Sequence, residues 1–307
     1  MTRHRRRTAA ALAGAALALG LLVSCGDGGD REPADAPGSS SAGDERSDPS
    51  EPSSSSPTAP TSSTETPAPS AVPVYYVGDT PQGDRLYREF VQASGVDPLV
   101  AGAAAVTQGD PVDPDYRTLW PSGRFASVQR TDAAIVVELA DGAWLRRGSL
   151  DAASARLAVQ QLVLTLQGVL GERLPVTVER DGRPAATLLG VKVGGGLTAR
   201  PQLDVLALVN VTEPAEGSVV SGTFAATGRA SSFEATVPWT VEDQSGKVVL
   251  DGFATAEGWI DKLYPWEAQV DVSGLDPGRY TFVARTDDPS GGEGGGPHVD
   301  TKRITVE

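Results

Sequence analysis

Hydrophobic residues are distributed unevenly along the 307-residue chain. An apolar run from Thr8 to Val23 comes first, and the next 46 residues or so contain almost no large apolar side chain. Apolar residues return at Val72 and continue to the C-terminus in helical and strand-like spacings. We therefore predict four segments: a signal segment (1–24), a linker (25–71), an α+β domain (72–200) and a β-sandwich domain (203–307).

The α+β domain is predicted from strands and helices that alternate along the chain. Runs rich in β-branched and aromatic residues, ended by Gly, Asp or Thr, predict strands at 72–77, 125–130, 133–139 and 176–179. Amphipathic or alanine-rich stretches predict helical segments around 86–91 and 98–107. This order favours a mixed sheet with helices packed on one face.

The clearest helix begins near Ser149, which can cap exposed backbone N–H groups, and ends at Leu170 before Gly171. Five of its apolar residues are spaced four and three apart: Ala155, Val159, Leu162, Leu166 and Val169. That spacing places them on one stripe, which we expect to be buried.

The second folded segment changes to alternating apolar and polar residues. Val237, Trp239 and Val241 share one face of a predicted strand, and Trp266 and Val270 share one face of another. Turn residues recur every eight to twelve positions, which is typical of an antiparallel immunoglobulin-like sandwich.

The segment LDPGRYTF contains Asp276, Gly278 and Tyr280 at the spacing of a tyrosine corner. In that motif the phenol hydroxyl returns to the backbone a few residues upstream. We expect Tyr280 to do so at an edge of the sandwich.

Composition supports a tethered, acidic protein. The linker is rich in Ser, Pro and Thr, so it cannot bury enough apolar surface to fold, and we expect it to be disordered with a span of roughly 35–40 Å. The formal charge is −14 for the full chain and becomes −18 when the four arginines of the signal segment are removed. This charge argues against nucleic acid as a partner.

The only cysteine, Cys25, follows the apolar run and the residues Leu22, Val23 and Ser24. With the basic start, this pattern resembles the bacterial lipoprotein signal, in which the cysteine receives a diacylglycerol and the chain is cut just before it. The resemblance implies a mature protein that begins at Cys25 and is anchored to the outer face of the cytoplasmic membrane, extending into the cell wall.

Two other interpretations of this N-terminus are open. An uncleaved membrane span needs about 20 apolar residues, and the run from Thr8 to Val23 is shorter. A plain secretory signal followed by a chance cysteine is the second alternative. An intramolecular disulfide is excluded because Cys25 has no partner cysteine.

The folded segments resemble two known domain families. The sequences VYYVGD, DYRTLWPSG and AVQQLVLTLQGVLGERLPVTVERDGRP are similar to the GerMN-type domain of spore-germination proteins and envelope lipoproteins. VTEPAEGSVVSGTFAATGRASSFEATVPWTVED and the closing RYTFVARTDD and HVDTKRITVE resemble the Gmad-type immunoglobulin-like domain of bacterial spore germination. The matching motifs are structural, and the resemblance implies no established chemistry.

Residues suited to catalysis or metal binding are scarce. The mature chain has one histidine, His298, beside a glycine-rich loop, and the lipid would consume the thiol of Cys25. Asp110, Asp113 and Asp115 could wrap a calcium ion, but the interleaved prolines favour a rigid, solvated turn. We predict no enzyme activity, no cofactor and no metal site.

Aromatic residues are the more suggestive candidates. Trp259, Tyr264 and Trp266 crowd into the segment GWIDKLYPW, where exposed rings could stack on a sugar or fill a pocket of a partner. The competing interpretation is that Trp266 and at least one other ring fill the sandwich core.

The sequence thus predicts a non-catalytic lipoprotein whose two domains bind an envelope component, from the cell wall or a membrane protein. An accessory regulator of a membrane sensor kinase is the alternative, because domains of the first type also occur in such lipoproteins. An envelope hydrolase ranks third, since no acid, base and nucleophile set is present.

Overall fold

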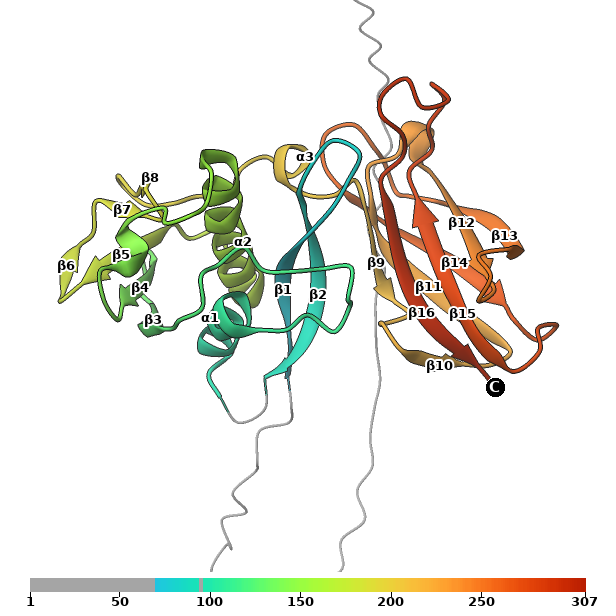
Figure 1. Ribbon diagram of the computed structural model, residues 1–307, viewed down its shortest axis with the longest axis horizontal. Helices are drawn as coiled ribbons and strands as arrows, with labels where there is room; N and C mark the ends of the chain where they lie inside the picture. Colours follow the sequence, from blue (N-terminus) through green and yellow to red (C-terminus); the bar gives the residue numbers. More distant parts are fainter. Residues whose placement is uncertain (1–69, 94–95) are drawn as a thin grey trace, which may run out of the picture. The chain divides into compact units, whose positions relative to one another are not determined.

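The computed structural model describes residues 70–93 and 96–307, all within one compact unit (Figure 1). The predicted signal segment, Cys25 and nearly all of the predicted linker lie outside the described residues. No helix of the described part is both long enough and apolar enough to span a membrane.

The first domain contains three α-helices and eight strands. In chain order they are β1 (Ser70–Gly78), β2 (Arg85–Ala93), α1 (Pro98–Gln108), β3 (Phe125–Arg130), β4 (Ile135–Leu139), the 3-10 helix η1 (Ala143–Leu145), α2 (Ala152–Leu170), β5 (Val176–Arg180), β6 (Arg183–Pro184), β7 (Thr187–Leu188), β8 (Val191–Lys192) and α3 (Gln202–Val205).

A mixed four-stranded sheet has the order β3-β4-β5-β6, with β4 and β5 parallel and the other pairs antiparallel. β1 and β2 form a separate antiparallel hairpin. Figure 1 shows α1 and α2 between this hairpin and the four-stranded sheet. Apolar side chains from all these elements form one core, in which Ile135, Leu162 and Leu166 are fully buried. The predicted α+β class is confirmed.

The segment around Leu86 to Val91, predicted to be helical, is instead the strand β2. Its apolar residues lack simple alternation because both faces are covered. Tyr87 belongs to the core of the first domain, whereas Leu86 packs with Leu206 and Leu263 on the other side. Pairing with β1 along nine residues overrides the local helical pattern.

The long helix α2 begins later than predicted. Its N-cap is Asp151, whose Oδ1 accepts hydrogen bonds from the backbone N–H groups of Ala153 and Ser154 at 2.7 and 2.9 Å. The carboxylate of Asp151 thus caps the helix in the role that the sequence analysis assigned to Ser149. The C-terminal stop is Gly171, as predicted, with a left-handed φ of 68°.

The second domain is an all-β sandwich, which confirms the second half of the predicted fold class. Its strands are β9 (Val209–Glu213), β10 (Ser218–Val220), β11 (Thr223–Ala230), β12 (Thr236–Glu242), β13 (Val248–Thr255), β14 (Tyr264–Asp271), β15 (Gly278–Arg285) and β16 (Val299–Val306), with a 3-10 turn η2 (Phe233–Ala235). One sheet has the order β10-β16-β15-β12-β13 and the other has β14-β11-β9.

Each sheet places a core tryptophan opposite a glycine. Trp239 pairs with Gly252 across β12 and β13, and Trp266 pairs with Gly228 across β14 and β11. A Cβ built on Gly252 would lie 2.4 Å from the Trp239 ring, and one built on Gly228 would lie 2.7 Å from the Trp266 ring. Each ring therefore covers a strand position that has no side chain. Tyr280 donates a hydrogen bond from Oη to the carbonyl of Asp276 at 2.8 Å, which is the expected tyrosine corner.

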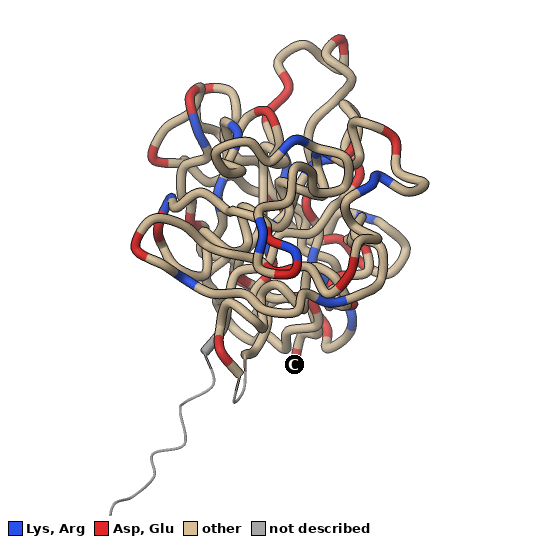
Figure 2. The backbone as a smooth tube through the Cα atoms, turned by 90° about the vertical axis from the view of Figure 1, so that its left-hand side faces the viewer, with Lys and Arg blue, Asp and Glu red and all other residues tan. Residues whose placement is uncertain are grey.

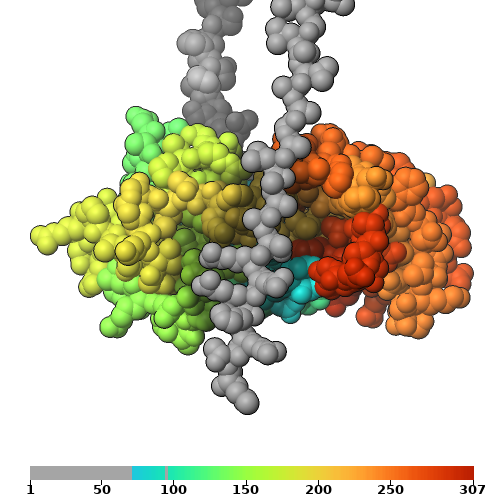
Figure 3. Space-filling view, turned by 90° about the horizontal axis from the view of Figure 1, so that it is seen from above, coloured from blue at the N-terminus to red at the C-terminus, as the bar shows by residue number. Residues whose placement is uncertain are grey.

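The two domains contact each other directly. Leu86 of β2, Leu206 after α3 and Leu263 before β14 belong to one small apolar cluster. The turn before β2 also meets the loop before β16 (Figure 3). There Gln82 Nε2 donates to the carbonyls of Gly294 and Gly296 at 3.0 and 3.2 Å. Figure 2 shows that acidic and basic positions are interspersed along the described backbone.

Candidate functional site

The three aromatic residues singled out from the sequence lie in different environments. Trp266 is 3% exposed and belongs to the sandwich core. Tyr264 is half-buried against that core, and Trp259 is 36% exposed. Trp259 is therefore the one of the three whose side chain a partner can most readily reach.

Two residues that sequence reasoning missed lie with Trp259 on the surface. Phe233 of η2 is 39% exposed and Ile260 is 65% exposed. The rings of Phe233 and Trp259 meet edge to face, with centroids 5.2 Å apart and planes at 73°. Phe233, Trp259 and Ile260 are called the aromatic patch below. The adjacent Trp259 and Ile260 after a glycine are the sequence signal for it, whereas Phe233 joins only through the fold.

The backbone of the aromatic patch is strained. Among the described residues, five that are not glycine have a positive φ, and three of them lie here: Glu234 (51°), Ala235 (60°) and Ile260 (89°). A β-branched residue strongly disfavours such a φ. Strain of this kind persists only where surrounding contacts hold it, and it concentrates at functional sites.

Hydrogen bonds fix the loop that carries Trp259 and Ile260. The N–H of Ile260 donates to Ser231 Oγ at 3.2 Å, and that of Leu263 donates to Gln202 Oε1 at 2.9 Å. Tyr264 Oη donates to Asp261 Oδ1 at 2.8 Å, a hydrogen bond that raises the pKa of Tyr264. The backbone of the loop that carries Trp259 is thus held in place, which lowers the entropy lost when a partner binds.

A second site, which is polar and was not predicted from the sequence, lies between the domains. We call Asp113, Tyr116, Asp300 and Lys302 the junction cluster; all four are buried. Lys302 Nζ pairs with Asp113 and donates to Asp300 Oδ1 at 3.1 Å and to Tyr116 Oη at 2.8 Å. Tyr116 Oη in turn donates to Asp300 Oδ1 at 2.6 Å.

Electrostatics keep Lys302 charged. Burial acts to lower the pKa of Lys302, but the nearby carboxylates of Asp300 and Asp113 outweigh it, so the pKa is raised. The remaining oxygen of Asp300 accepts from Asn210 Nδ2 at 3.0 Å and from the N–H of Val211 at 2.6 Å. Every charged member of the junction cluster therefore has a partner.

The predicted solvated turn at Asp110, Asp113 and Asp115 is wrong for Asp113, which is 1% exposed. Asp113 can be buried because Lys302 of the second domain pairs with it, and a buried carboxylate needs such a partner. Asp115 accepts a hydrogen bond from Thr301 Oγ1 at 2.6 Å. Asp113 and Asp115 thus contact the sandwich, and no metal-holding group of side chains is found at this turn among the described residues.

His298 is buried beneath the glycine-rich loop. The ring Nδ1 of His298 accepts a hydrogen bond from the backbone N–H of Leu208 at 3.2 Å. The backbone N–H of His298 donates to Thr286 Oγ1 at 3.1 Å. Burial, with a smaller contribution from the charge of Arg85, lowers the pKa of His298 to about 4. A neutral, hydrogen-bonded histidine at this position is a structural residue.

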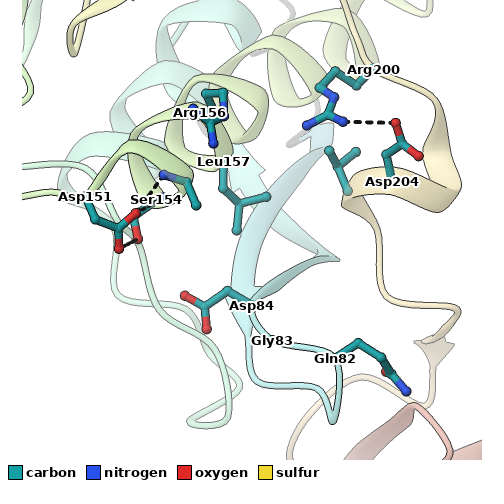
Figure 4. A pocket seen from close by; sticks show the side chains of 11 residues that line it. Gln82, Gly83, Asp84, Asp151, Ser154, Arg156, Leu157, Arg200 and Asp204 are labelled. Atoms are coloured by element: carbon teal, nitrogen blue, oxygen red, sulfur yellow. Dashed lines mark hydrogen bonds and ion pairs between the residues drawn. The ribbon is translucent and has the colours of Figure 1, made fainter. Parts of the chain in front are cut away.

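A pocket of about 390 Å³ lies beside the N-terminus of α2 (Figure 4). Most of its charged side chains already have partners: Asp151 caps the helix and bonds to Ser154, and Arg200 pairs with Asp204 at 3.0 Å. The lining contains no histidine or cysteine. Within residues 70–93 and 96–307, no group of three or more His, Cys, Asp or Glu side chains could hold a metal ion.

The fold defines a two-domain protein, an α+β domain followed by an immunoglobulin-like sandwich. Residues 73–186 match the family model for sporulation and spore germination, and residues 208–293 match the immunoglobulin-like domain of bacterial spore germination. The chain thus carries a sporulation and spore germination domain followed by an immunoglobulin-like domain of bacterial spore germination. The two domain resemblances noted in the sequence are confirmed.

Among solved structures, the tandem GerMN domains of the sporulation protein GerM from Bacillus subtilis share 14% identity, over 67% of this chain and 63% of that one, with a TM-score of 0.36. CopC from Methylosinus trichosporium OB3b shares 19% identity over 32% of this chain and 93% of its own, with a TM-score of 0.22. WR4, an MSP family member from C. elegans, shares 13% identity over 33% of this chain and 96% of its own, with a TM-score of 0.19. These low scores carry no conclusion about function. No curated protein matches the chain.

Proposed function

We propose that this chain is a non-catalytic lipoprotein of the bacterial envelope and that its aromatic patch binds a protein partner outside the cytoplasmic membrane. The observation that carries the proposal is the coincidence, at one place, of exposed aromatic rings and strained backbone at Glu234, Ala235 and Ile260. Tryptophan is one of the side chains enriched at the energetic centre of protein interfaces.

The non-catalytic assignment rests on the chemistry of the described side chains. His298 has a buried, neutral imidazole, and the carboxylates of the junction cluster are paired with Lys302. The pocket beside α2 offers a helix cap and an ion pair. In that pocket Ser154 Oγ donates to Asp151 Oδ2 at 3.0 Å, so a hydroxyl does lie next to a carboxylate. The hydrogen bonds that Asp151 accepts from Ser154 and Ala153 lower its pKa, which makes this carboxylate a weak base for nucleophilic catalysis.

Attachment to the membrane is proposed from the sequence around Cys25, which resembles the lipoprotein signal. Replacing Cys25 by Ser removes the thiol that a diacylglycerol would modify. The Cys25→Ser variant should leave the membrane fraction and appear in the medium. Retention of this variant in the membrane fraction would refute the lipid anchor.

Binding is tested by photo-crosslinking in intact cells. A photoreactive phenylalanine at Ile260 should give a discrete protein adduct, whereas the same residue at Val219 should not. Val219 is a matched control because it is also apolar and 59% exposed, but it lies on β10, outside the aromatic patch. An adduct with a sensor kinase would favour the regulatory alternative, and adducts of equal yield from both positions would contradict a specific site.

A further inference from the structure

A small cavity of about 210 Å³ lies where the first domain meets the sandwich. Three arginines line it: Arg88 of β2, Arg173 in the connection from α2 to β5, and Arg229 of β11. No carboxylate lines it. In a chain with a formal charge of −14, a cavity lined by three arginines and no carboxylate is an unusual local environment.

The hydrogen bonds of these arginines all go to neutral oxygens, and the guanidinium of Arg88 also lies over the Phe90 ring, 4.9 Å from its centroid. Arg88 Nη2 donates to Thr212 Oγ1 at 3.0 Å, Arg173 Nη1 donates to Gln167 Oε1 at 3.3 Å, and Arg229 Nη2 donates to the carbonyl of Leu263 at 2.7 Å. Within the described part of the chain, none of the three guanidinium groups forms an ion pair, although Arg117, Arg130, Arg180, Arg200 and Arg303 each do.

One of the three groups also has an unused donor. The Nε–H of Arg88 is buried and has no hydrogen-bond partner among the described residues. Burial, together with the charge of Arg229, lowers the pKa of Arg88. An arginine does not give up its proton in a protein, so repulsion between Arg88 and Arg229 persists until an anion compensates it.

We propose that this cavity, called the arginine pocket, binds a phosphate group. Three guanidinium groups match the charge of a dianion better than that of a single carboxylate, and their planar donors suit phosphate oxygens. The volume is below the 300–1,000 Å³ or so typical of pockets for drug-sized ligands, so it suits one small anionic group. Asn210, which also lines the cavity, adds a neutral polar side chain.

The source of the phosphate is either a small soluble ester or the headgroup of an anionic lipid. Both present the same chemistry to the arginine pocket. The pocket shares no residue with the aromatic patch, so this inference goes beyond the proposed partner binding. Its failure would leave the role of the aromatic patch intact.

The test is titration calorimetry of the full chain with inorganic phosphate and with glycerol 3-phosphate, alongside sedimentation with vesicles of phosphatidylglycerol. Arg229→Gln and Arg173→Gln should each weaken phosphate binding by about tenfold or more, which corresponds to about 1.4 kcal/mol. Arg285→Gln is the matched control, because Arg285 is exposed on β15 and outside the pocket. Arg173 is itself exposed, so its replacement should leave the fold intact.

Each outcome decides the proposal. Binding of the soluble phosphates that both pocket variants lose supports it with a soluble source. Vesicle binding that the same variants lose supports it with a lipid source. Absence of binding to all three probes, or binding that Arg285→Gln weakens as much as Arg229→Gln does, overturns it.

Discussion

At the scale of single residues, burial decides chemistry more strongly than residue type does. His298 and Asp113 are both titratable, and both are nearly inaccessible to water. His298 remains neutral because no anion compensates its burial, whereas Asp113 is paired with Lys302. The sequence predicted a solvated turn at Asp113 and placed His298 beside a glycine-rich loop. Neither pattern indicated burial, because such turns and loops usually lie at the surface.

The neutral state of His298 predicts a loss of stability in mild acid. Its pKa is about 4 in the folded protein and about 6.5 in an unfolded chain. The unfolded state therefore binds more protons between these values, and the free energy of unfolding falls as the pH drops through this window. The loss in free energy of unfolding is small above about pH 6.5 and reaches about 2 kcal/mol by pH 5.

Urea denaturation at pH 7 and pH 5 measures this effect. His298→Asn serves as the control, since an amide oxygen can accept the hydrogen bond of Leu208 without titrating. The variant should lose about 2 kcal/mol less than the wild type between the two pH values. Equal losses in both proteins would mean that His298 does not carry the dependence.

At the scale of elements, the sequence predicts the strands of the sandwich from their alternating apolar residues, but it does not predict the strand β2 of the hairpin. Val237, Trp239 and Val241 face the core as their spacing predicts, because one face of β12 packs inward. In β2, Leu86 and Tyr87 are both buried, on opposite faces, so the period of two disappears. A strand covered on both sides cannot be told from a helix by spacing alone.

The pairing of tryptophan with glycine in each sheet gives an element-level prediction. A Cβ at Gly228 would lie 2.0 Å from the carbonyl oxygen of Asn210 and 2.7 Å from the Trp266 ring. Gly228→Ala should therefore lower the free energy of unfolding by about 2 kcal/mol or more through overpacking.

Gly274→Ala is the matched control for Gly228→Ala. A Cβ at Gly274 meets no atom within 4 Å, so this change should alter stability by about 0.5 kcal/mol or less. Thermal melts of the two variants compare them directly. Similar melting temperatures would contradict the close packing of Trp266 over β11.

At the scale of the whole described chain, the junction cluster joins the two domains. Asp113 and Lys302 are 189 residues apart in sequence, so no local pattern could have predicted their pairing. Tyr87 adds a hydrogen bond from Oη to the carbonyl of Val299 at 2.9 Å. We therefore expect the two domains to unfold in one cooperative transition.

Lys302→Met tests the junction cluster. It leaves Asp113 and Asp300 buried without their cation, which should cost about 3–5 kcal/mol. Arg130→Met is the control, because its ion pair with Glu172 is 44% exposed on both sides and should contribute about 1 kcal/mol at most. Calorimetric transitions that shift equally in the two variants would show that the buried cluster does not couple the domains.

The most direct test of the proposed function is the yield of the crosslinked adduct from position 260, measured in cells with and without Trp259→Ala. We predict a discrete adduct from position 260, none from position 219, and a yield about tenfold lower when Trp259 is replaced while the melting temperature stays nearly unchanged. An adduct that forms equally well without the Trp259 ring would contradict binding through the aromatic patch.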